Sequence, residues 1–138
     1  MLTRAVLALV IIVCASAAAA GEAKVLALGL ADHEVTQEEL EKGEGLPVPR
    51  FNTGAIAYVL AAELKKGDVV EIAIVKDDKP LLGNNETLAE DRERFLLQAG
   101  KRGVPAGGWP DGKYHAALKV TRDGKTLIEQ SSTPIPFE

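Results

Sequence analysis

The sequence has very little of the side-chain chemistry on which enzymes and metal sites usually depend. Its 138 residues include one cysteine, two histidines and one tryptophan, and aromatic residues make up only 4%. A single cysteine, Cys14, excludes a disulfide within the chain and the paired cysteines of common zinc sites. Neither a G-x-S-x-G nor an H-E-x-x-H motif is present. We therefore predict no catalytic residue, no metal site and no cofactor.

The first twenty residues have the organisation of a cleavable secretory signal. Arg4 is followed by an unbroken apolar run over residues 5–14 and by small residues that end at Ala20. The apolar run is roughly half of the ~20 residues that span a bilayer. We expect cleavage after Ala20 and a periplasmic or secreted chain, with no transmembrane segment after cleavage. Lipid attachment at Cys14 is the alternative, although Val13 before it is bulkier than the small residue of lipoprotein signals.

The charge of the chain is mildly acidic. The formal net charge is −4, and the loss of Arg4 with the signal makes the mature chain more acidic. General affinity for nucleic acid requires a basic face, so nucleic acid is excluded as a partner. Residues 21–138 have the length of a single domain that can bury a sufficient apolar core without disulfides.

Alternating apolar and polar residues predict a domain built mainly of β-strands. Residues 24–30 alternate leucines with small residues, and residues 54–64 and 69–75 continue as two further strands. Residues 69–75 are apolar on both faces, which is typical of an inner strand. Several short strands separated by turn signals predict two packed antiparallel sheets.

Between the first two strands, residues 35–43 predict a short helix. Thr36 is its cap, Glu39 closes a capping box, and Gly43 ends it. The acidic residues near Thr36 are explained by favourable charge at a helix N-terminus rather than by a cation site. The prolines within residues 43–50 then predict an extended connector.

Residues 81–94 leave two structures open. Thr87 and Glu90 match a second capping box, which favours a helix, whereas the residues that follow alternate as in a strand. We favour a short turn followed by a strand over residues 94–99.

The last part of the chain predicts a β-hairpin. Strands over residues 114–120 and 126–130 are separated by Asp-Gly at residues 123–124, a strong hairpin signal. A two-residue turn without irregularity would place apolar Leu118 opposite Glu129. This mismatch favours a β-bulge in the hairpin.

The stretch GWPDGKY, residues 108–114, contains the candidate binding residues Trp109 and Tyr114. Strand alternation places Tyr114 on the apolar face, and it places His115 on the solvent face between two lysines that would oppose a metal ion. We expect Trp109 to cover the open end of the core, with its indole N–H bonded to the backbone. An exposed aromatic platform for a sugar or a partner chain is the alternative.

The same stretch, followed by the turn at residues 122–125, resembles the last hairpin of bacterial exported immunoglobulin-like and fibronectin-III-like domains. The common pattern is a Pro/Gly turn, a Tyr that begins a strand and an Asp-Gly hairpin, and the strands back to Gly54 fit it loosely. The resemblance implies an immunoglobulin-like antiparallel β-sandwich, a fold that hosts many functions. Because the paired cysteines and core Trp of antibody domains are absent, the similarity is to the cysteine-free versions.

These patterns favour an exported, non-enzymatic module of the cell envelope. Such a module would bind another envelope protein or a glycan through a sheet edge, a face or the Trp109 loop. A small periplasmic hydrolase or metal carrier using His33 and the neighbouring Asp32 and Glu34 is the alternative, and it requires these side chains to converge. A structural role within a larger assembly also stays open.

Overall fold

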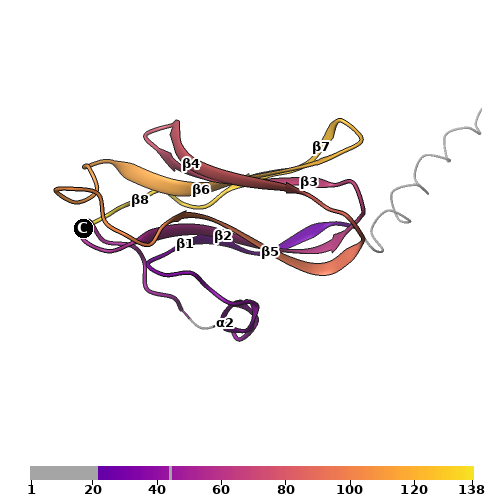
Figure 1. Ribbon diagram of the computed structural model, residues 1–138, viewed down its shortest axis with the longest axis horizontal. Helices are drawn as coiled ribbons and strands as arrows, with labels where there is room; N and C mark the ends of the chain where they lie inside the picture. Colours follow the sequence, from indigo (N-terminus) through magenta and orange to yellow (C-terminus); the bar gives the residue numbers. More distant parts are fainter. Residues whose placement is uncertain (1–21, 44) are drawn as a thin grey trace, which may run out of the picture.

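The computed structural model describes residues 22–43 and 45–138, so the predicted signal peptide lies outside the described residues. Two antiparallel sheets pack face to face, with the helix α2 on the outside of one of them (Figure 1). The predicted all-β sandwich with one short helix is confirmed. The elements are β1 (Lys24–Ala31), α2 (Gln37–Glu41), β2 (Ala55–Leu64), β3 (Val69–Lys76), β4 (Lys79–Thr87), β5 (Arg92–Lys101), β6 (Lys113–Arg122), β7 (Lys125–Ser131) and β8 (Ile135–Pro136).

The sheets have three and five strands. The three-stranded sheet has the order β1-β2-β5, and the five-stranded sheet has the order β4-β3-β6-β7, with β8 paired to the start of β6. The strand β3 lies between β4 and β6, as its apolar pattern predicted. Its Val70, Ile72 and Ile74 are buried between the sheets, whereas Glu71 is exposed.

The helix α2 begins and ends where the sequence predicts. The Thr36 hydroxyl accepts the Glu39 backbone N–H at 3.2 Å, and the Glu39 carboxylate accepts the Thr36 backbone N–H at 2.9 Å. Both halves of the capping box are therefore present. The helix is followed by Gly43, which has a positive φ that favours glycine.

The open question at residues 81–94 is settled in favour of strands. Thr87 ends β4, so the second capping box does not begin a helix, and β5 contains the predicted strand over residues 94–99. The turn between them is fixed by Leu88, whose N–H donates to the Asp68 carbonyl at 2.9 Å. The sequence signal for β4 is weak because this edge strand is almost entirely exposed.

Three edge strands carry a β-bulge, and each bulge holds an exposed leucine. The residues are Leu26 in β1, Leu81 in β4 and Leu127 in β7. The bulge predicted for the last hairpin is thereby confirmed. The alternating leucines of residues 24–30 do not all share one face, because the bulge turns Leu26 outward and Val25 packs against the core instead. Bulges interrupt the regular row of backbone groups to which a further strand would pair.

Candidate functional site: an aromatic hollow at one end of the sandwich

Trp109 lies in the loop between β5 and β6 and closes one end of the core. Its side chain is 7% exposed, and its indole N–H donates to the Thr53 carbonyl at 2.8 Å. Its backbone N–H donates to the Phe51 carbonyl at 2.9 Å. The predicted covering role is confirmed by this geometry, whereas an exposed platform does not fit a ring with so little free surface.

Tyr114, the second candidate binding residue, is the second residue of β6 and has no exposed surface. Its hydroxyl donates to the Pro110 carbonyl four residues upstream. Burial raises the pKa of Tyr114, which keeps the hydroxyl protonated as a donor. A Tyr near the start of a strand with such a bond also occurs in immunoglobulin-type sandwiches, where it is called the tyrosine corner. Tyr114 is therefore buried in the core below the candidate site and offers no surface to a ligand.

Phe137 joins these two residues into an aromatic cluster. Its ring is stacked on Tyr114, with centroids 3.8 Å apart and planes 6° apart, and it meets Trp109 edge-on at 5.8 Å. Aromatic pairs in these arrangements contribute roughly 0.5–1.5 kcal/mol beyond the area that they bury. The cluster is thus a rigid floor at this end of the molecule.

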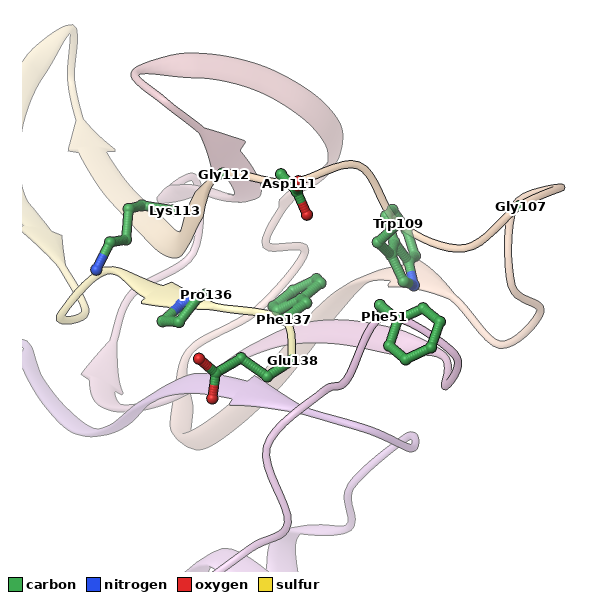
Figure 2. A pocket seen from close by; sticks show the side chains of 9 residues that line it. All are labelled: Phe51, Gly107, Trp109, Asp111, Gly112, Lys113, Pro136, Phe137 and Glu138. Atoms are coloured by element: carbon green, nitrogen blue, oxygen red, sulfur yellow. The ribbon is translucent and has the colours of Figure 1, made fainter.

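A hollow of about 560 Å³ lies over this floor. The Phe51 ring is 50% exposed at its wall, and Asp111 and Lys113 supply opposite charges (Figure 2). No sequence pattern pointed to Phe51, because it lies in an irregular connector and reaches Trp109 only through the tertiary fold.

Gly108 explains how the loop approaches Phe51 so closely. Its φ is +88°, and a Cβ at this position would lie 2.8 Å from Cδ2 of Phe51 and 2.9 Å from its carbonyl oxygen. Glycine is therefore required both by conformation and by space. Gly108 therefore lets the loop before Trp109 pack directly on Phe51.

The two histidines lie apart from this hollow. His115 is half-buried on the outer face of β6 opposite Val75, the face predicted for it. His33 follows β1, and its Nδ1 and Nε2 lie 2.8 Å from Asp32 and 3.0 Å from Glu39. Hydrogen bonds to Asp32 and then to Glu39 raise the pKa of His33.

The alternative hypothesis required His33, Asp32 and Glu34 to converge, and Glu34 does not join the other two. Glu34 instead accepts a hydrogen bond from Arg102 at 2.7 Å, and Glu39 of α2 takes its place beside His33. The two carboxylates bind opposite nitrogens of the imidazole, so they do not converge on one point. Among residues 22–43 and 45–138, no group of three potential metal ligands is placed to hold an ion.

Within the described part of the chain, no helix has both the length and the apolar character needed to cross a membrane. A scan against protein-family models and a search of the curated proteins each found no match to this chain.

Proposed function

We propose that the chain is an exported, non-enzymatic binding module of the cell envelope that recognises a protein or glycan partner at the aromatic hollow. The observation that carries the proposal is the half-exposed Phe51 ring in a hollow with a rigid aromatic floor. Its volume of about 560 Å³ falls within the roughly 300–1,000 Å³ of ligand pockets, which combine apolar walls with a few polar groups.

An immunoglobulin-like or fibronectin-III-like origin of the module is part of the proposal. Two features support it: the tyrosine corner at Tyr114 and a two-sheet arrangement of seven main strands. In the constant-type immunoglobulin domain, the fourth strand belongs to the sheet of the first, second and fifth strands. Here β4 pairs with β3, so the kinship is with a variant in which this strand belongs to the opposite sheet.

The edges of the sandwich support recognition at the hollow rather than by strand addition. The bulges at Leu26, Leu81 and Leu127 interrupt three edge strands. On the fourth edge strand, β5, the Asn84 side-chain amide donates to the Gln98 carbonyl at 2.9 Å and occupies an acceptor that an added strand would use.

The hollow offers a partner two kinds of contact. The half-exposed Phe51 provides an apolar surface on which a sugar ring or an apolar side chain can pack. Asp111 and Lys113 provide an acceptor and a donor at the rim. Glu138 adds a second carboxylate to the lining, so the hollow is acidic on balance and favours a partner that offers hydrogen-bond donors or positive charge.

The test compares Phe51→Ala with Val104→Ala, a second exposed apolar residue that does not line the hollow. The mature chain, residues 21–138, is applied to a glycan array and to an envelope extract, and affinity for each captured partner is measured by titration. We expect Phe51→Ala to lose about tenfold or more in affinity and Val104→Ala to bind as the parent does. Equal behaviour of both variants, or a parent chain that captures nothing specific, contradicts the proposal.

Export is tested separately. The full chain is expressed in a bacterium, and the mass of the protein in the periplasm and the medium is measured. A product that begins at Gly21 is expected. An uncleaved chain that stays in the cytoplasm contradicts the export part of the proposal.

A further inference from the structure

The charges at the aromatic hollow are uneven. Two carboxylates, those of Asp111 and Glu138, line it, together with one ammonium group, that of Lys113. All three residues are exposed. None of the ion pairs among residues 22–43 and 45–138 includes any of them. The hollow therefore carries an excess of negative charge that no ion pair within the described chain neutralises.

These groups are also oriented differently, as Figure 2 shows. The Asp111 carboxylate points toward the Phe137 ring, and Glu138 lies on the other side of that ring. The Lys113 ammonium group lies beyond Pro136 and points away from the ring. The carboxylate of Asp111, and not the ammonium group of Lys113, therefore faces the aromatic floor.

A second lysine near the hollow is already paired. Lys76 lies close enough to Asp111 for their charges to interact. Its Nζ, however, lies 3.0 Å from the Asp77 carboxylate, which also accepts the Lys113 backbone N–H at 3.0 Å. Lys76 and Asp77 therefore compensate each other, and Asp111 remains available for a cation from outside the chain.

The half-exposed ring of Phe51 adds a second attraction for a cation. Gly108 packs against one side of this ring, and 50% of Phe51 remains exposed. The face of an aromatic ring carries partial negative charge, so it attracts a cation as a carboxylate does. The arginine guanidinium combines the two contacts best, because it is planar, stacks on aromatic faces and has five N–H donors.

The chain itself contains an arginine on a phenylalanine ring. The guanidinium carbon of Arg92, which pairs with the end of β2, lies 5.3 Å from the centroid of the Phe95 ring. At the hollow, Phe51 and Asp111 provide the ring and the acceptor, but among the described residues no arginine lines it. A partner must supply the cation.

We propose that the partner recognised at the hollow is a protein that inserts an arginine side chain, whose guanidinium packs on Phe51 and donates to Asp111. Glu138 and the net charge of −4 attract such a partner at longer range. The inference rests on the function proposed above and selects a protein over a neutral glycan. A neutral sugar would displace water from the Asp111 carboxylate and supply no positive charge in return.

The test compares two probes that differ in charge and hardly in shape, N-acetyl-arginine amide and N-acetyl-citrulline amide. Each is titrated into the mature chain, and binding is followed by NMR through the indole N–H of Trp109 and the backbone amides. We expect the arginine probe to saturate the signals of the hollow and the citrulline probe to bind about fivefold more weakly. Affinity for the arginine probe should also fall as salt is added, because exposed charges are screened.

Asp111→Ala and Glu90→Ala provide a matched pair of variants. Each removes one exposed carboxylate, and Glu90 lies in the turn between β4 and β5 and does not line the hollow. We expect Asp111→Ala to bind the arginine probe about fivefold more weakly and Glu90→Ala to bind it as the parent does. Phe51→Leu keeps an apolar side chain and removes the ring, so it should weaken arginine binding about threefold.

Equal affinity for arginine and citrulline, or equal behaviour of Asp111→Ala and Glu90→Ala, overturns the assignment of arginine. If Phe51→Ala still loses the captured partner in that case, the hollow remains a binding site and only this assignment fails. Methyl glucosaminide, an amino sugar with the same positive charge, is the third probe, and tighter binding of it than of arginine overturns the choice of a protein. If Phe51→Ala and Val104→Ala capture the partner equally, the proposed function and this inference fail together.

Discussion

The two ends of the sandwich are closed by different chemistry. At one end, the buried Asp68 carboxylate accepts two hydrogen bonds from Arg122 and one from the Lys65 N–H, each at 2.8 Å. At the other end, the rings of Trp109, Tyr114 and Phe137 fill the core, and the hollow remains above them. The comparison teaches that the charged end is closed by fully bonded polar groups, whereas the aromatic end combines packed rings with a hollow that is open to solvent.

The charged end joins three segments that are distant in sequence. Asp68 lies in the turn between β2 and β3, Arg122 ends β6, and the Leu88 N–H donates to the Asp68 carbonyl. Burial alone would raise the pKa of Asp68, but the bonds from Arg122 and Lys65 outweigh it and lower that pKa. The carboxylate is thus charged, buried and fully bonded, a combination in which the loss of one partner is costly.

The largest effect is expected for Asp68→Ala. The substitution leaves the Lys65 N–H and a partly buried Arg122 without their acceptor, which should cost about 3–5 kcal/mol in the free energy of unfolding. Urea denaturation followed by Trp109 emission measures it. Asp91→Ala, which removes an exposed acceptor of the Lys66 N–H nearby, is the control and should cost far less. Similar losses in both variants would show that Asp68 does not hold this end.

Lowering the pH tests the contribution of Asp68 to stability in a second way. Because the pKa of Asp68 is lowered in the folded chain, its contribution is complete above the ordinary value of 3.8. The contribution is lost as the pH falls through the lowered pKa. Asp68→Asn should therefore lose less stability than the parent when the pH is lowered below about 4. Parallel losses of the two proteins would contradict this role of Asp68.

A smaller loss is expected at the aromatic end for Tyr114→Phe. The ring and its stacking on Phe137 are kept, and the hydrogen bond to the Pro110 carbonyl is removed. The expected cost is about 1 kcal/mol, the net contribution of a typical hydrogen bond. Urea denaturation measures it, and Tyr58→Phe is the control, because Tyr58 is only half-buried. A cost as large as that of Asp68→Ala would mean that this end also depends on one polar bond.

The elements that depend on neighbouring residues were predictable from the sequence. The capping box of Thr36 and Glu39 is a local pattern, and so is the Asp-Gly hairpin at residues 123–124. Its bulge was predictable because Leu118 and Glu129 are mismatched across a short turn. The bulge at Leu26 was not, because it is set by register against β2, whose strand begins more than twenty residues later.

The candidate site was only half predictable. Trp109 and Tyr114 stand out in a chain with few aromatics, and strand alternation gave the direction of Tyr114. Phe51 and Phe137 were not predictable as neighbours of Trp109. Each reaches it only when segments that are distant in sequence fold together. The ion pair of Asp68 and Arg122 was not predictable for the same reason, because 54 residues separate its members.

His33 gives the stability of the fold a weak dependence on pH. Neutral imidazole has one N–H and can donate to Asp32 or Glu39 but not to both, so the doubly bonded state favours the protonated ring. Since its pKa is raised in the folded chain, the contribution is complete below 6.5 and is lost as the pH rises through the raised pKa. The exposed position limits it to a fraction of 1 kcal/mol.

Thermal unfolding of the parent and His33→Gln between about pH 5.5 and 8.5 measures this effect. The parent should lose its small advantage over the variant as the pH rises. His115→Gln, which changes the other histidine of the described chain, is measured as the control. A parent advantage that grows with pH would mean that neutral His33 is the stabilising form and would contradict the bridging role.

Phe51→Ala is expected to change stability least, by no more than about 0.5 kcal/mol, because half of the ring is exposed and its bonded group is the backbone carbonyl. The backbone N–H of Trp109 should keep its bond to that carbonyl, and the indole N–H should keep its bond to the Thr53 carbonyl. The emission maximum of Trp109 should therefore not move. Urea denaturation and the emission spectrum measure both. A stable variant that loses its partner would show that Phe51 serves recognition, whereas a loss of several kcal/mol would place Phe51 in the core and remove the contrast between the two ends.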